Sequence, residues 1–267
     1  MPLAVCATPI GNLDDVTLRV LAELREADVV LAEDTRHTRG LLERHGIAAR
    51  LVSYHEHNEA SRVAEFLPRL VAGERIALVS DAGLPAVSDP GARLVRAALD
   101  AGVRVTVLPG PSAVETALVA SGLVGERYAF VGFLPRRRGE LDALWAELTS
   151  SPWPTVAFES PQRLPATLAS LAAVAPERDV AVCRELTKKF EEVVRGTAAE
   201  LAARFADAPR GEITVVLGPS SSDASDSAAA VAAVSDLVAA GTPRRVAAEI
   251  VSRLTDVSKN DLYRDTL

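Results

Sequence analysis

The 267-residue sequence has little cysteine and no long hydrophobic run. Cys6 and Cys183 both lie inside short apolar runs, so we expect buried, reduced thiols and no disulfide framework. No apolar run approaches the roughly 20 residues that cross a membrane, and no basic segment precedes the first apolar run, as it does in a signal peptide. These absences predict a soluble, cytoplasmic protein without a membrane partner.

Lysine is also scarce. Of the 29 basic residues, only three are lysines (Lys188, Lys189 and Lys259) and the rest are arginines. With 36 acidic residues the formal net charge is −7, which argues against indiscriminate coating of nucleic acid. Local arginine patches stay compatible with an RNA partner.

Short, β-branched apolar runs alternate with longer helical patterns in the first part of the chain. This alternation predicts a largely parallel sheet covered on both faces. The expected strands are residues 3–7, 29–32, 76–79 and 103–108, and the expected helices are 16–25, 59–72 and 92–101. Gly102 stands where a helix C-terminus is expected.

The second half continues this pattern less regularly, with strands expected at 129–132, 155–159, 179–183 and 213–217 and helices at 141–149 and 164–174. We place a hinge between about 111 and 127. The small polar residues of 219–227 indicate a linker, and the helices expected after it are 228–240, 243–254 and 259–264. The predicted division is 1–115 and 116–218 for two α/β domains, 219–227 for the linker, and 228–267 for a helical tail.

Loops rich in glycine and proline follow three of the expected strands, at residues 7–13, 80–91 and 109–113. The carboxyl edge of a parallel sheet is where α/β proteins bind ligands, and small residues let the backbone approach them closely. In the second loop, Asp89 and Pro90 also fit the N-cap and first turn of a helix. None of these loops matches the Rossmann or P-loop pattern, so a dinucleotide dehydrogenase and a P-loop kinase are disfavoured.

Charged residues also follow the strand that ends at Ala32. Asp34 or Thr35 suits a helix N-cap, but the neighbouring Arg36 and His37 exceed what a cap requires. His55 and His57 have a spacing that some metal sites use, yet no further ligand has a matching position. We therefore predict no metal site, and favour a polar loop or an RNA contact.

Charged groups end three strands of the second half as well, around Glu159, at 184–188 and at Glu212. Since they come from a different part of the chain than the glycine-rich loops, a cleft shared by both halves is expected.

Taken in order, these segments form a recognisable series: ATPIGNL, AEDTRHT, HEHNE, VSDAG, SDPG, LPGPSA, GFLP, FESP, RELTK and GEITVV. The series resembles bacterial 16S ribosomal RNA cytidine-2′-O-methyltransferases, which have the tetrapyrrole-methylase fold. The resemblance spans roughly residues 3–217 and resumes weakly at 258–263. One departure is Leu84, where members often have threonine.

The resemblance implies an S-adenosylmethionine-dependent enzyme that acts on 16S ribosomal RNA or the small ribosomal subunit and forms a homodimer. It places the cofactor in a cleft between the two domains. The residues implied to bind the cofactor are Ile10, Asp81, Ala82, Gly83, Ser112, Ala113, Glu159, Leu186 and Glu212.

Methylation of a ribose 2′-hydroxyl requires loss of a proton, so a base or a cation near the oxygen would help. Lys188 beside Glu185 is one candidate, although a surface ion pair is an equal interpretation, and Asp34 steered by Arg36 is the rival. The candidate RNA-binding residues are Arg36, His37, Arg136, Arg137 and Arg138, with further basic residues in the tail. We expect the three consecutive arginines in a loop between the domains, followed by a flexible Gly139. The reaction requires no metal or redox cofactor.

Two other functions remain open at this stage. A small-molecule methyltransferase of the same fold, acting on a tetrapyrrole precursor, would be expected to carry a Gly-Asp-Pro-type loop at 80–82 and to lack the 36–37 and 55–59 motifs. A non-catalytic RNA-binding assembly factor would not bind the cofactor.

Overall fold

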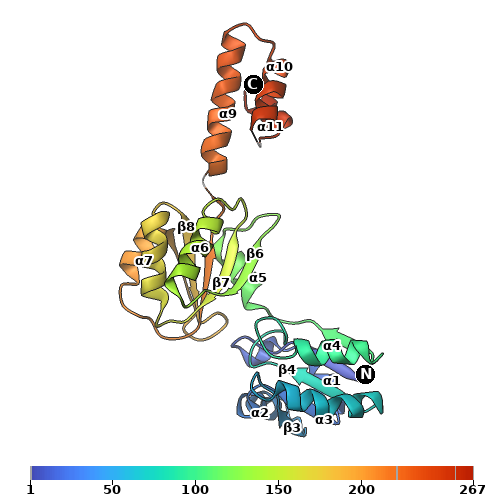
Figure 1. The fold of residues 1–267 in the computed structure, drawn as a ribbon. Helices are drawn as coiled ribbons and strands as arrows, with labels where there is room; N and C mark the ends of the chain where they lie inside the picture. Colours follow the sequence, from blue (N-terminus) through green and yellow to red (C-terminus); the bar gives the residue numbers. More distant parts are fainter. Residues whose placement is uncertain (1, 221, 256, 267) are drawn as a thin grey trace.

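The computed structural model describes residues 2–220, 222–255 and 257–266, with the side chains of 222–228 left out of the description. Figure 1 shows two α/β units, each built on its own sheet, followed by three tail helices that stand apart from both. The predicted fold class, two α/β domains with a helical tail, is confirmed. The boundaries at 115, 218 and 227 stay predictions.

The first sheet has five strands, all parallel, in the order β3-β2-β4-β1-β5. They are β1 (Leu3–Cys6), β2 (Val29–Ala32), β3 (Leu51–Ser53), β4 (Ile76–Val79) and β5 (Val105–Leu108). The helical elements around it are η1 (Leu13–Asp15), α1 (Leu18–Glu26), α2 (Thr35–Arg44), α3 (Glu59–Val71) and α4 (Ala92–Asp100). Apolar side chains of α1 and α2 pack on one face, and those of α3 and α4 pack on the other. This confirms the predicted parallel sheet with two covered faces.

The second sheet has the order β6-β7-β10-β8-β9 and is mostly antiparallel, because β6 and β7 are the only parallel pair among its neighbouring described strands. Its strands are β6 (Ala129–Phe133), β7 (Thr155–Glu159), β8 (Asp179–Arg184), β9 (Glu192–Thr197) and β10 (Ile213–Leu217). The short connection from β8 to β9 allows antiparallel pairing, whereas a parallel pair needs a long crossover. The parallel arrangement of the first domain therefore does not extend to the second.

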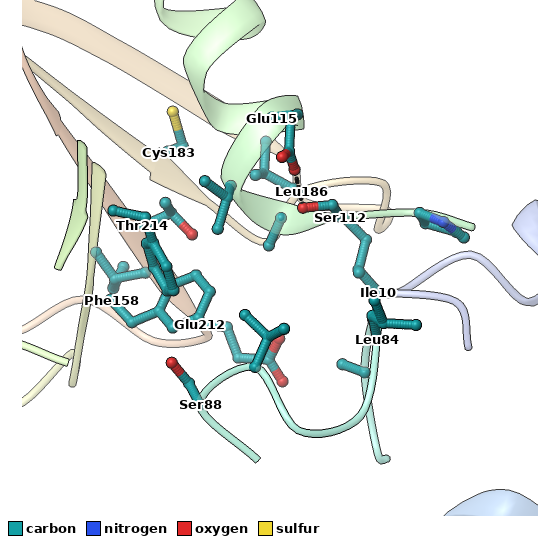
Figure 2. A pocket seen from close by; sticks show the side chains of 18 of the residues that line it. Ile10, Leu84, Ser88, Ser112, Glu115, Phe158, Cys183, Leu186, Glu212 and Thr214 are labelled. Atoms are coloured by element: carbon teal, nitrogen blue, oxygen red, sulfur yellow. Dashed lines mark hydrogen bonds between the residues drawn. The ribbon is translucent and has the colours of Figure 1, made fainter. Parts of the chain in front are cut away.

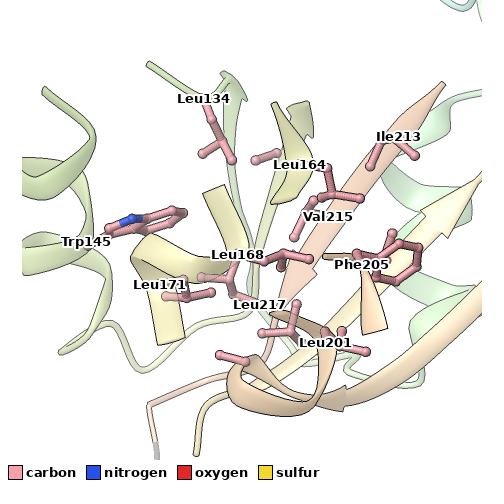
Figure 3. Close-up of a cluster of buried hydrophobic side chains, with 14 of the residues drawn as sticks. Leu134, Trp145, Leu164, Leu168, Leu171, Leu201, Phe205, Ile213, Val215 and Leu217 are labelled. Atoms are coloured by element: carbon pink, nitrogen blue, oxygen red, sulfur yellow. The ribbon is translucent and has the colours of Figure 1, made fainter. Parts of the chain in front are cut away.

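Helices cover both faces of the second sheet. They are α5 (Ala113–Ser121), α6 (Arg138–Leu148), α7 (Leu164–Val174) and α8 (Ala198–Arg204). On one face, Trp145 of α6 and Leu168 of α7 pack with Val215 in the cluster drawn in Figure 3. On the other face, α5 contributes Leu118, which packs near Cys183. Burial raises the pKa of the Cys183 thiol to about 11, and both cysteines are free and buried, as predicted.

Several local predictions need correction. The sequence patterns missed β3, β9, α5 and α8, and indicated α2 only by its possible N-cap. Asp34 does cap α2, since its side chain accepts a hydrogen bond from the Arg36 backbone amide. Asp89 does not cap α4, because the N-cap residue is Gly91. Gly102 follows the end of α4 with a φ of 72°, in agreement with the C-terminal signal.

The tail consists of α9 (Ser222–Ala239), α10 (Arg244–Leu254) and α11 (Lys259–Asp265). Because α9 already begins at Ser222, most of the segment expected as a linker is helical, and residue 221 within it lies outside the described residues. Val234, Val251 and Leu262 are at the centre of a small apolar cluster that holds the three helices together. Among the described residues, none of the helices is long and apolar enough to span a membrane.

Candidate functional site

A cavity of about 760 Å³ lies between the two α/β domains, and both contribute to its walls (Figure 2). This volume falls within the range typical of small-molecule sites. The first domain supplies the loops that follow β1, β4 and β5, which are the carboxyl ends of parallel strands. The second domain supplies the start of α5, the strands β6 and β7, and the segments around Leu186 and Ile213.

The loops of the first wall are tied to each other by backbone hydrogen bonds. Thr8 and Gly83 pair in both directions, with N···O distances of 2.8 and 3.1 Å, and the Thr8 hydroxyl donates to the Ser80 carbonyl at 3.0 Å. Gly83 has a φ of 78°, a conformation that favours glycine. This wall is therefore formed by backbone held in one conformation.

The two domains are in direct contact beside the cavity. The Asn12 amide donates to Thr187 Oγ1 at 3.0 Å. A Cβ atom at Gly11 would lie only 2.5 Å from Lys188 Cγ and 2.9 Å from the Leu186 carbonyl oxygen. Glycine at position 11 thus allows the loop after β1 to lie against the segment that carries Leu186 and Lys188.

The residues expected to bind the cofactor gather at this cavity. All of them line it except Asp81: Ile10, Ala82, Gly83, Ser112, Ala113, Glu159, Leu186 and Glu212. The Asp81 carboxylate instead accepts a hydrogen bond from the Asp34 amide at 3.0 Å, which links the loop after β4 to the loop after β2.

Glu159 faces the domain interior. Its buried carboxylate accepts hydrogen bonds from the Thr167 hydroxyl at 2.6 Å and the Ser160 amide at 2.6 Å, and forms an ion pair with Arg163 at 3.0 Å. These partners occupy its oxygens, so Glu159 supports the cavity wall.

The two candidates for a base do not line the cavity. The Lys188 ammonium lies 3.0 Å from Glu185 Oε1 and 3.0 Å from Glu212 Oε2. Burial alone would lower the pKa of Lys188, but hydrogen bonds to Glu212 and Glu185 raise it above its ordinary value. Lys188 is therefore a cation next to a residue of the cavity wall.

Asp34 is equally unsuited to accept a proton at neutral pH. Hydrogen bonds from the Arg36 side chain and backbone lower the pKa of its carboxyl, and the Arg36 guanidinium forms an ion pair with it at 2.7 Å.

The candidate RNA-binding residues Arg36, His37, Arg136, Arg137 and Arg138 are all exposed. Arg136 and Arg137 lie between β6 and α6 of the second domain, and Arg138 and Gly139 are the first two residues of α6. This corrects the expectation of a flexible loop between domains. Arg137 and Arg138 form ion pairs with Glu140 and Asp142 in the first turns of α6.

Sequence reasoning did not assign Asp89, a titratable group of the cavity, to the site. Asp89 lines it, and burial together with the nearby Glu33 and Asp81 raises the pKa of its carboxyl to about 7, although a hydrogen bond with Ser80 acts in the opposite direction. Its place in a glycine- and proline-rich loop after a strand was the available signal, and helix capping seemed a sufficient explanation.

A group of aromatic residues on the opposite wall was also missed: Tyr128, Phe130, Phe133 and Phe158. The Phe158 ring packs edge-to-face against Phe130 and Phe133, with centroid separations of 5.0 and 5.4 Å. The Tyr128 hydroxyl donates to Glu115 Oε1 at 2.7 Å, and Glu115 also bonds the Ser112 hydroxyl, as Figure 2 shows.

The histidines do not form a metal centre. The His55 and His57 rings are in edge contact with centroids 5.9 Å apart, and the described residues contain no group of three His, Cys, Asp or Glu side chains that could hold a metal ion.

The sequence and the fold can both be compared with known proteins. The sequence model of the tetrapyrrole (corrin/porphyrin) methylases matches residues 2–202. "Ribosomal RNA small subunit methyltransferase I" of Mesorhizobium japonicum is 45% identical over 99% of this chain and 91% of its own, and the protein of that name from Micromonospora olivasterospora is 45% identical over 98% and 85%. These matches include the tail, where the motifs alone indicated only a weak resemblance.

Solved structures share the fold at lower identity. Uroporphyrin-III C-methyltransferase from Thermus thermophilus superposes with a TM-score of 0.58 at 23% identity, covering 81% of this chain and 93% of that one. A cobalt precorrin-4 methyltransferase gives a TM-score of 0.61 at 21% identity, covering 81% and 94%. The chain therefore belongs to the tetrapyrrole methylase family and, within it, to the group whose curated relatives carry the name ribosomal RNA small subunit methyltransferase I.

Proposed function

We propose that this protein transfers a methyl group from S-adenosylmethionine to the ribose 2′-hydroxyl of a cytidine in the 16S RNA of the small ribosomal subunit. The observation that carries the proposal is the interdomain cavity, whose walls include nearly every residue that the family resemblance implies for cofactor binding. Similarity to the relatives named as small-subunit RNA methyltransferases supports the RNA substrate.

The cavity suits S-adenosylmethionine in size and in chemistry. Among the described residues that line it are the carboxyl groups of Asp89, Glu115 and Glu212, besides the inward-facing Glu159, and no lysine, arginine or histidine. That balance favours a ligand with a positive sulfonium. The backbone of Ala82, Gly83 and Pro111 would hold its polar groups, and the apolar side chains of Ile10 and Leu186 would pack against its adenosine part. The bound cofactor supplies an activated methyl group.

The side chains of this protein then have to orient the ribose and accept the proton that its 2′-hydroxyl loses. Holding two reactants in line contributes about 7–11 kcal/mol in well-oriented systems. Among the carboxylates of the cavity, Asp89 has a pKa near 7, which suits a general base. The Lys188 cation, positioned by Glu185, would stabilise negative charge on the ribose oxygen or a flanking phosphate. Asp34 would act through Arg36, which it orients toward RNA.

The substrate is an RNA, so cations must surround the cavity mouth. We assign this role to Arg36, His37 and the three arginines at 136–138, because phosphate binding by arginine is bidentate and needs exposed guanidinium groups. The protein would act as a homodimer in the cytoplasm, with S-adenosylmethionine as its only cofactor.

A tetrapyrrole methyltransferase is the second candidate. The corrin and porphyrin enzymes share the fold at 21–23% identity, whereas the relatives named for ribosomal RNA reach 45%. The sequence difference therefore favours RNA over a tetrapyrrole.

Two measurements test the proposal together. Calorimetric titration with S-adenosylmethionine should show saturable binding, and small subunits from cells lacking the modification should acquire one 2′-O-methylcytidine, located by mass mapping of the RNA. Without cofactor binding, the protein would be an assembly factor, and binding without RNA methylation would favour a small-molecule substrate.

A further inference from the structure

We infer that Phe133, at the mouth of the cavity, is a stacking platform for an unpaired base of the RNA substrate, and that it sets the position of the target nucleotide. This inference rests on the proposed function and deepens it. Nothing in the family motifs assigns a role to this side chain.

The first observation is the exposure of the ring. Phe133 is 62% exposed although it belongs to a strand and lines the cavity. Single exposed apolar side chains are common, whereas contiguous apolar patches mark binding surfaces, and Phe133 adjoins the other aromatic residues of the cavity wall. Aromatic residues make up only 4% of the chain, so the group of four on one cavity wall is a strong local concentration.

The second observation is that the backbone presents this ring rigidly. Gly132 has a φ of 69°, and the pairing of β6 with β7 shifts register between Phe130 and Phe133. The next residue, Leu134, is buried, and its amide donates to the Phe158 carbonyl at 3.0 Å.

The carbonyl groups of Leu134 and Pro135, the two residues that follow Phe133, are also held in place. Arg163 donates to the Leu134 and Pro135 carbonyls at 2.8 Å each, and the buried Glu159 carboxylate holds Arg163. The ring is therefore exposed on a braced segment, an arrangement that reduces the entropic cost of binding.

The third observation identifies the occupant. The same braced segment leads directly into the three exposed arginines at 136–138. A cationic run that binds phosphates next to an aromatic ring that stacks on a base is the usual arrangement for single-stranded RNA. The cofactor is a weaker candidate, because small ligands are largely enclosed and the inner rings Phe130 and Phe158 are more buried than Phe133.

The test compares Phe133→Ala, Phe133→Leu and Phe133→Trp with the full-length wild-type protein. Loss of one stacked base weakens binding by between about five-fold and a hundred-fold. We expect Phe133→Ala to raise the KM for unmethylated small subunits by a factor in that range. The KM of Phe133→Leu should be nearly as high, because leucine has no ring to stack, and the KM of Phe133→Trp should be close to that of the wild type. The melting temperature and the Kd for S-adenosylmethionine should stay at wild-type values.

The matched control is Trp153→Ala. Trp153 is another exposed aromatic of the same domain, 39% exposed, and precedes β7 at the end of the strand opposite the cavity. This variant should leave the KM for subunits unchanged.

A second readout does not depend on methylation. Single-stranded RNA containing 2-aminopurine should lose fluorescence on binding to the wild-type protein and keep it with Phe133→Ala. A wild-type protein that quenches the probe but methylates no subunit would contradict the proposed function alone. The inference is wrong if Phe133→Ala or Phe133→Leu behaves like wild type, or if Phe133→Ala weakens cofactor binding as much as subunit binding.

Discussion

At the scale of single residues, the site depends on backbone conformation as much as on side-chain chemistry. Ile10, Gly83 and Ser112 line the cavity from three separate loops, and the family resemblance had implied all three for cofactor binding. Asp89 and Phe133 were not predicted. The role of Asp89 depends on its burial, and that of Phe133 depends on its exposure at the cavity wall. Neither property can be calculated without knowing which loops face each other.

Gly83→Val tests the backbone wall. A Cβ atom at this position would have neighbours no closer than 3.8 Å, so the cost arises from its φ of 78° and amounts to about 1–2 kcal/mol of stability. We expect the variant to fold but to lose detectable S-adenosylmethionine binding in calorimetry. Gly102→Val is the control, because Gly102 has a φ of 72° with open space around it. Equal cofactor affinities in the two variants would disprove the placement of Gly83.

Asp89→Asn tests the titratable group. The folded-state pKa of about 7 lies above the ordinary 3.8, so ionisation of Asp89 lowers stability as the pH rises from about 4 to 7. An amide at this position cannot ionise, so Asp89→Asn should gain stability over wild type at pH 8 and not at pH 4, as measured by urea unfolding. If Asp89 accepts the proton, the single-turnover rate of the wild type rises through pH 7 and that of the variant is at least about ten-fold lower and flat.

Comparison of Lys188→Arg with Lys188→Ala distinguishes whether Lys188 acts as a cation or as a base. Arginine stays protonated at any accessible pH, so Lys188→Arg should keep a substantial part of the single-turnover rate if charge is what matters, while Lys188→Ala should lose at least about ten-fold. Both should bind the cofactor. Should arginine be as damaging as alanine, Lys188 acts through its shape or as a base. Asp34→Ala should lower the stability through the lost helix cap and leave the chemical step unchanged.

At the scale of helices and strands, hydrophobic patterns predicted most of the first sheet, because β1, β2 and β4 are buried throughout and separated by amphipathic helices. Strand β3 was missed since its three residues are only half-buried, and β9 because its short segment contains Glu192, Arg195 and Gly196. The directions in the second sheet depend on which strands become neighbours, and no local pattern encodes that choice. The polar residues after Pro219 suggested a linker, although α9 already starts at Ser222.

The arginine run at the start of α6 is the element that we expect to contact phosphates. Replacing Arg136, Arg137 and Arg138 with alanine should weaken binding to small subunits and reduce the salt dependence of that binding by up to about three phosphate contacts. The ion pairs lost within α6 are exposed and contribute little to stability. Measurement of KM between about 50 and 200 mM salt tests this, with the cofactor Kd as the control. A triple variant that methylates at the wild-type rate at every salt concentration would show that the run does not bind RNA.

At the scale of the whole molecule, the central claim is that two domains close around one cofactor and present it to RNA. The contact between Asn12 and Thr187 and the shared walls of the cavity make the site a property of both domains. The three tail helices stand apart from both α/β domains in Figure 1.

The most direct test is a single-turnover assay in which the protein, preloaded with isotopically labelled S-adenosylmethionine, is mixed with small subunits lacking the modification, followed by mass mapping of the 16S RNA. The account predicts transfer of one labelled methyl group per subunit, on the 2′-oxygen of one cytidine. Transfer to a base atom or to no RNA at all, from a protein that binds the cofactor, would contradict it.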